Sequence, residues 1–170
     1  MRLSFSSNEY LNTVIRDEDG RQLYSISSPG FLRCKTTITK HGPQGDDDVI
    51  GIITWHLFRD AKIWLKATGV EVEGNSLLKL KWFSSSRTFT GPDGKEYSWN
   101  LETTNCRLKE KGSGVEVAKY HQRNFGIMSP SHAPYLEISP SVSHMLDYIV
   151  ITFVYAEKSS ADAESAAAGA

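Results

Sequence analysis

The sequence predicts a mainly β protein, a barrel or a sandwich of short strands around one wholly apolar segment. Strand-like runs alternate with turn residues along the chain, about ten in all, which is more than one flat sheet usually holds. The apolar segment covers residues 148–156, YIVITFVYA, and carries no charge. Because every face of this segment is apolar, it must be buried on all sides.

The first half of the chain supplies hairpin and strand signals. Residues 12–16 and 21–27 flank an Asp-Gly turn and predict a β-hairpin. Residues 35–40, KTTITK, are rich in β-branched residues and predict the next strand. Residues 49–58 are apolar at both alternating sets of positions, so we expect a strand covered on both sides.

The second half continues the pattern. Residues 61–67 alternate between apolar and polar positions, with Ile63 and Leu65 on the expected inner face. A second Asp-Gly turn, at Asp93 and Gly94, predicts another hairpin. The further strands are expected at residues 70–73, 78–82, 87–90, 95–102, 107–110, 115–121 and 135–138.

Length, charge and cysteine content bound the class of protein. The 170 residues suit one domain, which we expect to span residues 1–158. The net charge of −1 provides no general attraction for nucleic acid, so no nucleic-acid partner is expected. Cys34 and Cys106 are far apart in the sequence and predict reduced thiols rather than a disulfide framework.

The sequence predicts an intracellular, cytoplasmic protein. The N-terminal residues lack the apolar core of a secretory signal. Asp147 and Glu157 bracket the apolar segment, which is therefore shorter than the roughly 18 uncharged residues that cross a bilayer. No transmembrane segment is expected.

No catalytic, metal or cofactor motif is found. The five histidines, at positions 41, 56, 121, 132 and 144, have no partners at metal-ligand spacing. The acidic runs 17–19 and 46–48 lack the pattern of a calcium loop and are better explained as solvated turns. The sequence also has neither a phosphate-binding loop nor a Gly-x-Ser-x-Gly elbow. We therefore expect no metal and no cofactor and identify no catalytic residue. This favours a protein that is not an enzyme and leaves an enzyme as the alternative.

One group of residues suggests a binding surface. Lys79 and Lys81 share a face of one predicted strand, Arg87 follows shortly after, and Trp82 and Phe83 lie between them. A basic patch edged by aromatic rings can hold a lipid head group or another anion. The alternative is a solvated outer face on which lysines discourage edge-to-edge pairing.

Four pieces of the chain resemble a family of uncharacterised proteins from mushroom-forming fungi, over about residues 1–158. These pieces are residues 19–26 (DGRQLYSI), 89–99 (FTGPDGKEYSW), 117–121 (VAKYH) and 146–155 (LDYIVITFVY). That family is distantly similar to the tubby C-terminal and LURP-one-like superfamily. The resemblance implies a closed antiparallel β-barrel of about ten to twelve short strands around a C-terminal hydrophobic helix. It also implies basic residues on the barrel that bind phosphoinositides in tubby-type relatives.

The resemblance also bears on the secondary structure of the apolar segment. Its β-branched residues favour a central strand. Apolar residues at helical spacing from Val142 onward, a possible cap at Ser139 and Pro140 in the first turn favour a helix. With the resemblance, we predict a helix over about residues 140–158, roughly 28 Å long. Residues 159–170 are expected to be a frayed helix end or a disordered tail.

Two functions remain open. The first is a binding or scaffold module that docks an anionic lipid or a protein partner on the barrel exterior. The second is a small-ligand carrier or enzyme with a pocket at a barrel mouth, lined by His56, His121 or Tyr120. The second needs space that a threaded helix would fill.

Overall fold

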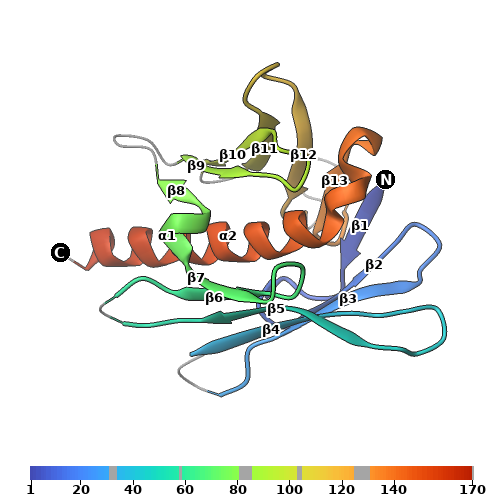
Figure 1. Cartoon of the computed structure of the whole chain (residues 1–170). Coiled ribbons are helices and arrows are strands. Elements are labelled where there is room, and N and C mark those ends of the chain that lie inside the picture. The colour runs from blue at the N-terminus through green and yellow to red at the C-terminus, as the bar shows by residue number, and fades with distance from the viewer. Residues whose placement is uncertain (31–33, 58, 81–85, 103–104, 125–130, 170) are drawn as a thin grey trace.

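A computed structural model describes residues 1–30, 34–57, 59–80, 86–102, 105–124 and 131–169. Figure 1 shows strands on both sides of one long helix, α2. The elements in chain order are β1 Arg2–Phe5, β2 Thr13–Arg16, β3 Gln22–Ser27, β4 Lys35–Lys40, β5 Asp48–Thr54, β6 Lys62–Leu65, β7 Val70–Glu73, α1 Gly74–Leu77, β8 Lys79–Leu80, β9 Ser86–Thr90, β10 Glu96–Glu102, β11 Asn105–Glu110, β12 Glu116–His121, β13 Tyr135–Ile138, the 3-10 helix η1 Pro140–Met145 and α2 Leu146–Ala168.

Local sequence signals account for most of the strands. Both predicted Asp-Gly hairpins form, β2 with β3 and β9 with β10. Gly20 and Gly94 have φ of 79° in these turns, a conformation that glycine adopts without steric cost. In β6 the alternation is confirmed, since Ile63 and Leu65 are buried and Trp64 is only partly buried. β5 ends at Thr54, four residues before the expected end. This strand was expected to be covered on both sides, but its Ile52 is only partly buried.

The predicted closed barrel is wrong. The thirteen strands form one antiparallel sheet in the order β7-β6-β5-β4-β3-β2-β1-β13-β12-β11-β10-β9-β8, with β7 and β8 as unpaired edges. The chain passes from β7 to β8 through α1, where the amide of Leu78 donates to the carbonyl of Gly74 at 2.7 Å. A helical turn uses its backbone groups locally, and β8 has only two residues, so no ladder joins the two edges. The sheet curls around α2 without closing.

The predicted C-terminal helix is confirmed, and the strand alternative is excluded. Ser139 caps η1 by accepting from the amide of Ser141, and Pro140 occupies the first turn. The α-helix proper begins at Leu146 rather than near residue 140. Among the residues that the structure describes, no helix combines the length and the apolarity needed to cross a membrane.

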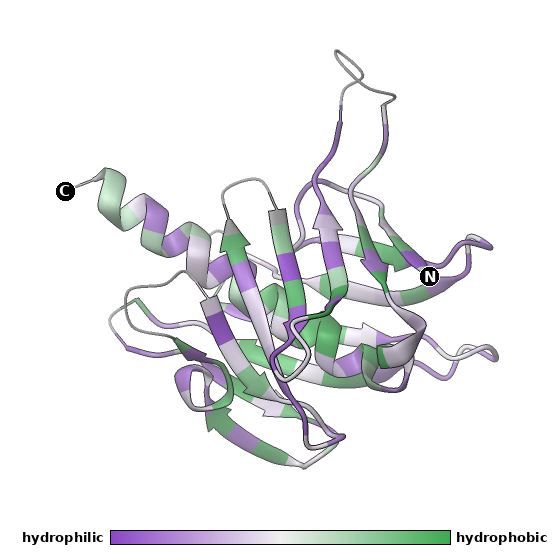
Figure 2. Ribbon diagram, turned by 90° about the horizontal axis from the view of Figure 1, so that it is seen from above, coloured by the Kyte–Doolittle hydropathy of each residue, from purple (hydrophilic) through white to green (hydrophobic). Residues whose placement is uncertain are grey.

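The helix is longer than predicted. It continues to Ala168, so residues 159–168, expected as a frayed or disordered tail, are helical and are exposed from Ala161 onward. Alanine has the highest helix propensity, and the Lys158–Asp162 ion pair, four residues apart, adds support on the surface. Figure 2 shows this part of α2 projecting beyond the strands, while the apolar part lies among them.

The interior of the curled sheet is filled by α2. Residues 149–156 are each at most 2% exposed. The ring of Phe153 lies 5.8 Å from those of Phe5 and Trp99 and 4.8 Å from that of Tyr120, measured between centroids. The indole N–H of Trp99 donates to the Thr152 hydroxyl at 3.0 Å, which satisfies the polar groups of both buried side chains.

Two glycines let α2 approach the sheet closely. A Cβ added at Gly51 in β5 would lie 2.9 Å from the Ile151 side chain. One added at Gly74 in α1 would lie 2.4 Å from the Tyr155 ring. Both distances are too short for carbon atoms, so only glycine fits at these positions without movement of the helix.

Candidate functional site

Of the three basic residues predicted to form a binding surface, the structure describes Lys79 and Arg87. Lys79 is exposed in β8 and pairs with Thr88, whereas Arg87 pairs with Leu80. Since successive side chains of a strand point to opposite faces, Lys79 and Arg87 lie on opposite faces of the β8–β9 ribbon. Lys81, Trp82 and Phe83 lie outside the described residues. A lipid site built jointly by Lys79 and Arg87 therefore gains no support.

Arg87 instead belongs to a cluster between the open sheet edges. Its guanidinium donates to the Asn75 side chain at 2.9 Å and lies 5.1 Å from the centroid of the Tyr155 ring. The Tyr155 hydroxyl donates to Asp60 at 3.1 Å, and burial raises the pKa of Tyr155 to about 12. These contacts join α1, β9, α2 and the loop after β5, which makes Arg87 a structural residue.

The residues expected at a barrel mouth do not meet in one pocket. The ring of His121 stacks on Tyr135 at 4.2 Å, and burial lowers the pKa of His121. His56 is partly buried in the loop after β5. Tyr120 is 4% exposed and lines a cavity at the exit of α2, described below. Within the described ranges, no group of three His, Cys, Asp or Glu side chains is placed to hold a metal ion.

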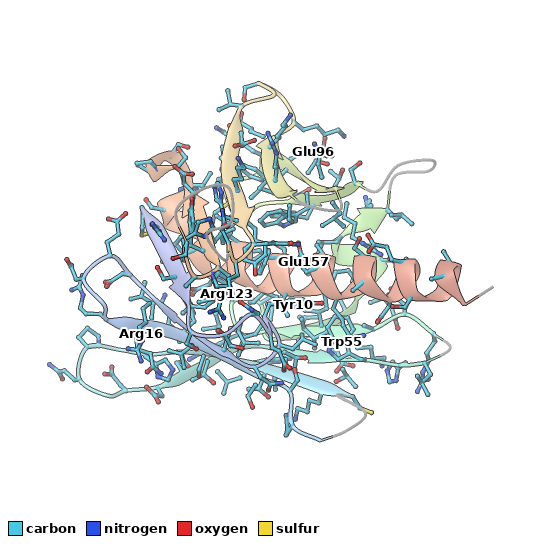
Figure 3. All side chains as sticks on the ribbon, turned by 180° about the vertical axis from the view of Figure 1, so that it is seen from behind. Tyr10, Arg16, Trp55, Glu96, Arg123 and Glu157 are labelled. Atoms are coloured by element: carbon cyan, nitrogen blue, oxygen red, sulfur yellow. The ribbon has the colours of Figure 1, made fainter. Side chains whose placement is uncertain are left out.

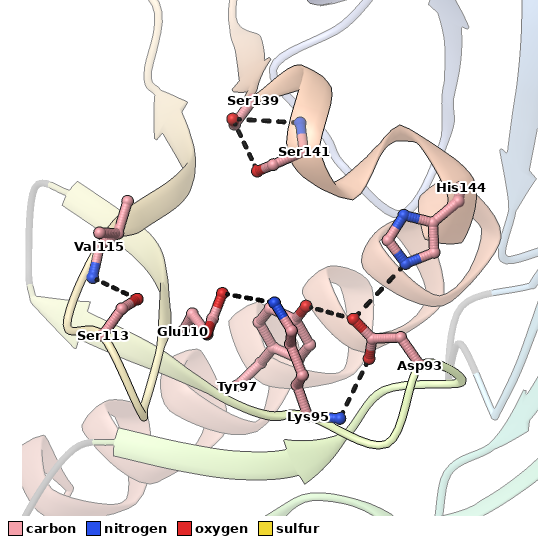
Figure 4. A network of polar contacts seen from close by, with 9 residues as sticks. All are labelled: Asp93, Lys95, Tyr97, Glu110, Ser113, Val115, Ser139, Ser141 and His144. Atoms are coloured by element: carbon pink, nitrogen blue, oxygen red, sulfur yellow. Dashed lines mark hydrogen bonds and ion pairs between the residues drawn. The ribbon is translucent and has the colours of Figure 1, made fainter.

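A polar network at the N-terminal end of α2 contains Ser, His and Asp without forming a catalytic triad (Figure 4). The Nε2 atom of His144 lies 3.5 Å from the Asp93 carboxylate, which also accepts from the Tyr97 hydroxyl at 2.7 Å. Burial alone would raise the pKa of Asp93, but the hydrogen bond from Tyr97 keeps this pKa below its ordinary value. Ser139 pairs with Ser141 instead of His144. The network therefore has no nucleophile beside its histidine.

One concave site is a crevice where α2 leaves the sheet, here called the exit crevice. The described residues also line a cavity of about 290 Å³ beside β12 and β13 and one of about 510 Å³ beside the loops after β1 and β12. The exit crevice consists of two adjoining cavities of about 340 Å³ and 230 Å³ that share Tyr10, Gln122 and Glu157. Figure 3 shows Tyr10, Glu157 and Arg123 gathered in this region. The larger cavity is completed by Asn8, Tyr120, Arg123 and Pro134. The smaller one is completed by Leu101, Cys106, Ser160, Ala161 and Glu164.

Glu157 is the central charged group of the exit crevice. It follows directly after the buried part of α2, so its carboxylate lies at the boundary between core and solvent. Burial raises the pKa of Glu157, the Cys106 thiol opposes this by donating to the carboxylate, and the charge of Glu164 raises the pKa further. Burial likewise raises the pKa of Cys106, whose thiol is 3% exposed. Cys106 is thus a protonated donor rather than a nucleophile.

The comparisons with known proteins identify a family. A family model described as Family of unknown function (DUF6593) matches residues 8–162. The chain belongs to this family. In this DUF6593 protein the exit crevice falls within the matched span except for Glu164. A fungal origin is not shown by the match and stays a prediction.

The comparisons with solved structures and with curated proteins assign no function to the DUF6593 protein. A solved structure of a protein from Arabidopsis thaliana, AT5G01750, is similar with a TM-score of 0.48 and 14% identity, over 91% of this chain and 90% of that chain. We base no conclusion on a likeness at this level, and the relation to the tubby superfamily stays a prediction. A search of curated proteins gave no match.

The walls of the exit crevice in the DUF6593 protein carry aromatic and polar side chains. They combine two tyrosines with amide and carboxylate groups, which suit recognition of a small polar group. Sequence reasoning named Tyr120 and missed Glu157, which served only to mark the end of the apolar segment. The available signal was a carboxylate placed directly after nine uncharged residues, because such a position leaves the charge half-buried.

Proposed function

We propose that this protein is a non-enzymatic binding module whose ligand site is the exit crevice. The observation that supports this most strongly is the filled interior, since residues 149–156 of α2 are each at most 2% exposed. A carrier of the kind that stores its ligand inside a β-barrel needs an empty lumen. The exit crevice lies outside this filled interior, at the surface beside α2. We also propose a cytoplasmic location.

A fragment titration followed by NMR tests the exit crevice directly. We expect small fragments to shift the amide signals of Tyr10, Gln122 and Glu157 first. Ala161→Trp would fill the smaller cavity and abolish these shifts, because Ala161 lines it. Ala163→Trp, which lies nearby on the exposed part of α2, is the matched control and should leave them unchanged. Shifts confined to other surfaces, or unaffected by Ala161→Trp, would show that the crevice is not the site.

A second candidate is docking to an anionic membrane through the edge strand β8. Lys79 is exposed and Leu80, on the opposite face of the β8–β9 ribbon, is 54% exposed, so this edge presents a cation on one face and an apolar side chain on the other. Such a pair suits the surface of an anionic bilayer. The test is sedimentation with phosphoinositide-containing vesicles at low and high salt. We expect binding at low salt that Lys79→Glu weakens; no binding at low salt would end this candidate.

A further inference from the structure

We infer that the smaller cavity of the exit crevice binds an organic cation, a primary ammonium or guanidinium group, between Glu157 and Glu164. This inference rests on the proposed function and names the class of ligand. Four features of the described residues support it: the charges, the free space, the aromatic wall and the placement of the nearby cations.

The charged residues described in the wall of the smaller cavity are both negative. They are Glu157 and Glu164, and the described part of the wall has no lysine, arginine or histidine. The two residues are seven positions apart on α2 and therefore lie on one face, two turns apart. Among the described residues, Glu157 has no ion pair; its partner is the neutral thiol of Cys106. A half-buried carboxylate with only a weak neutral donor is incompletely compensated.

The space between the two carboxylates is open. The helix positions between them that face the cavity are Ser160 and Ala161, whose side chains are small. The resulting cavity of about 230 Å³ is large enough for an alkylammonium group and too small for a large ring system. The opposite wall, from Tyr10 and Leu101, is aromatic and apolar. A tyrosine ring beside carboxylates is a common arrangement for holding ammonium and guanidinium groups.

The nearby cations of the protein do not occupy this cavity. Lys158 pairs with Asp162, and its ammonium lies 5.4 Å from the centroid of the Trp55 ring, away from the crevice. Arg123 lines the larger cavity and does not line the smaller one. A bound cation would therefore supply a compensating charge that no described residue in the wall of the smaller cavity provides.

The groups that face Glu157 define how binding responds to pH. They are the thiol of Cys106 on β11, the phenol of Tyr120 on β12, the phenol of Tyr10, the carboxylate of Glu164 and the guanidinium of Arg123. Burial raises the pKa values of Cys106 and Tyr120, so both stay protonated at neutral pH. Glu157 is then the group whose ionisation should switch cation binding on as the pH rises above 4.5, its ordinary value.

The test is a calorimetric and NMR titration of the full chain at constant ionic strength. The probes are n-butylammonium chloride, n-butanol as the neutral analogue and sodium butyrate as the anion. We expect n-butylammonium to bind and the other two to bind at least about tenfold more weakly. Glu157→Gln should weaken the binding of n-butylammonium about tenfold and leave the affinity for n-butanol unchanged. Asp162→Asn, which alters a carboxylate paired with Lys158, is the matched control and should have no effect.

The outcomes separate this inference from the proposed function. If n-butanol or butyrate shifts the crevice signals as strongly as n-butylammonium, the crevice is a site but not for cations. Equal affinity of wild type and Glu157→Gln for n-butylammonium would also overturn the inference. Should Glu157→Gln fail to fold, Glu164→Gln, at an exposed position of α2, replaces it in the test. We expect the same loss of affinity for n-butylammonium. If no probe or fragment binds in the crevice, the proposed function fails as well.

Discussion

The hydroxyl of Tyr155 in α2 lies 3.1 Å from the carboxylate of Asp60, in the loop between β5 and β6. Asp60 also accepts from the backbone amide of Asn75 at 2.6 Å, and Asn75 accepts from Arg87. These side-chain bonds connect the two edges of the sheet where no backbone ladder forms. The buried helix therefore holds the sheet in its curled shape from the inside.

Tyr155→Phe should loosen the junction between the sheet edges. The substitution removes the hydrogen bond to Asp60 and keeps the ring, so we expect a loss of about 1–2 kcal/mol in the free energy of unfolding. Urea denaturation measures it. Tyr148→Phe is the control, since the Tyr148 hydroxyl makes no hydrogen bond to the described residues. Equal stability of Tyr155→Phe and Tyr148→Phe would show that the junction does not depend on this bond.

Gly74→Ala should force α2 away from α1. The new Cβ would lie 2.4 Å from the Tyr155 ring, and the ring cannot move freely within the core. We expect a loss of about 1–3 kcal/mol, measured by thermal and urea unfolding. At Gly112 a Cβ would have a nearest contact of 3.9 Å, so Gly112→Ala should be close to neutral. If the two variants are equally stable, the close approach of helix and sheet is not as described.

Glu157→Gln should change the pH dependence of stability. Burial raises the pKa of Glu157 in the folded state, so the folded protein binds a proton more tightly than the unfolded chain does. The free energy of unfolding of the wild type should then fall, relative to Glu157→Gln, as the pH rises from 4.5, the unfolded value, through the folded value. Urea titrations between pH 4 and pH 8 would measure this difference. A constant difference across the range contradicts the buried position of the carboxylate.

Phe153→Ala should be among the most damaging substitutions in the chain. The ring is fully buried and contacts Phe5, Trp99 and Tyr120. Its removal leaves a cavity, and we expect a loss of about 3–5 kcal/mol in the free energy of unfolding. Leu57→Ala, at a side chain that is 85% exposed, should change stability by less than about 0.5 kcal/mol. Similar losses in both variants would contradict the filled interior.

The elements of the fold could be predicted from the sequence because their signals are local. Ile63 and Leu65 alternate with Lys62 and Trp64, and the two Asp-Gly turns fix their hairpins. The strand pairing at the sheet edges could not be predicted in this way. Whether β7 meets β8 depends on the helical turn at Gly74 and on contacts between residues far apart in the sequence.

The candidate functional residues likewise depend on contacts between distant parts of the chain, which local sequence signals do not show. Spacing alone predicts one patch from Lys79, Lys81 and Arg87. The register that puts Lys79 and Arg87 on opposite faces depends on the pairing of β8 with β9, which spacing does not show. The exit crevice is built from β10, β11, β12, the loops after β1 and β12, and α2, which no local pattern brings together. Tyr120 was suspected only as one aromatic residue at a strand end.

Amide hydrogen exchange along α2, followed by NMR, is the most direct test of the central claim that this helix fills the curled sheet. Residues 149–156 should exchange only through global unfolding, with protection equal to that of the central strands. Residues 160–168, on the exposed extension, should exchange faster by several orders of magnitude. Fast exchange throughout residues 149–156 under conditions in which the strands stay protected would show that the helix is not the core of this protein.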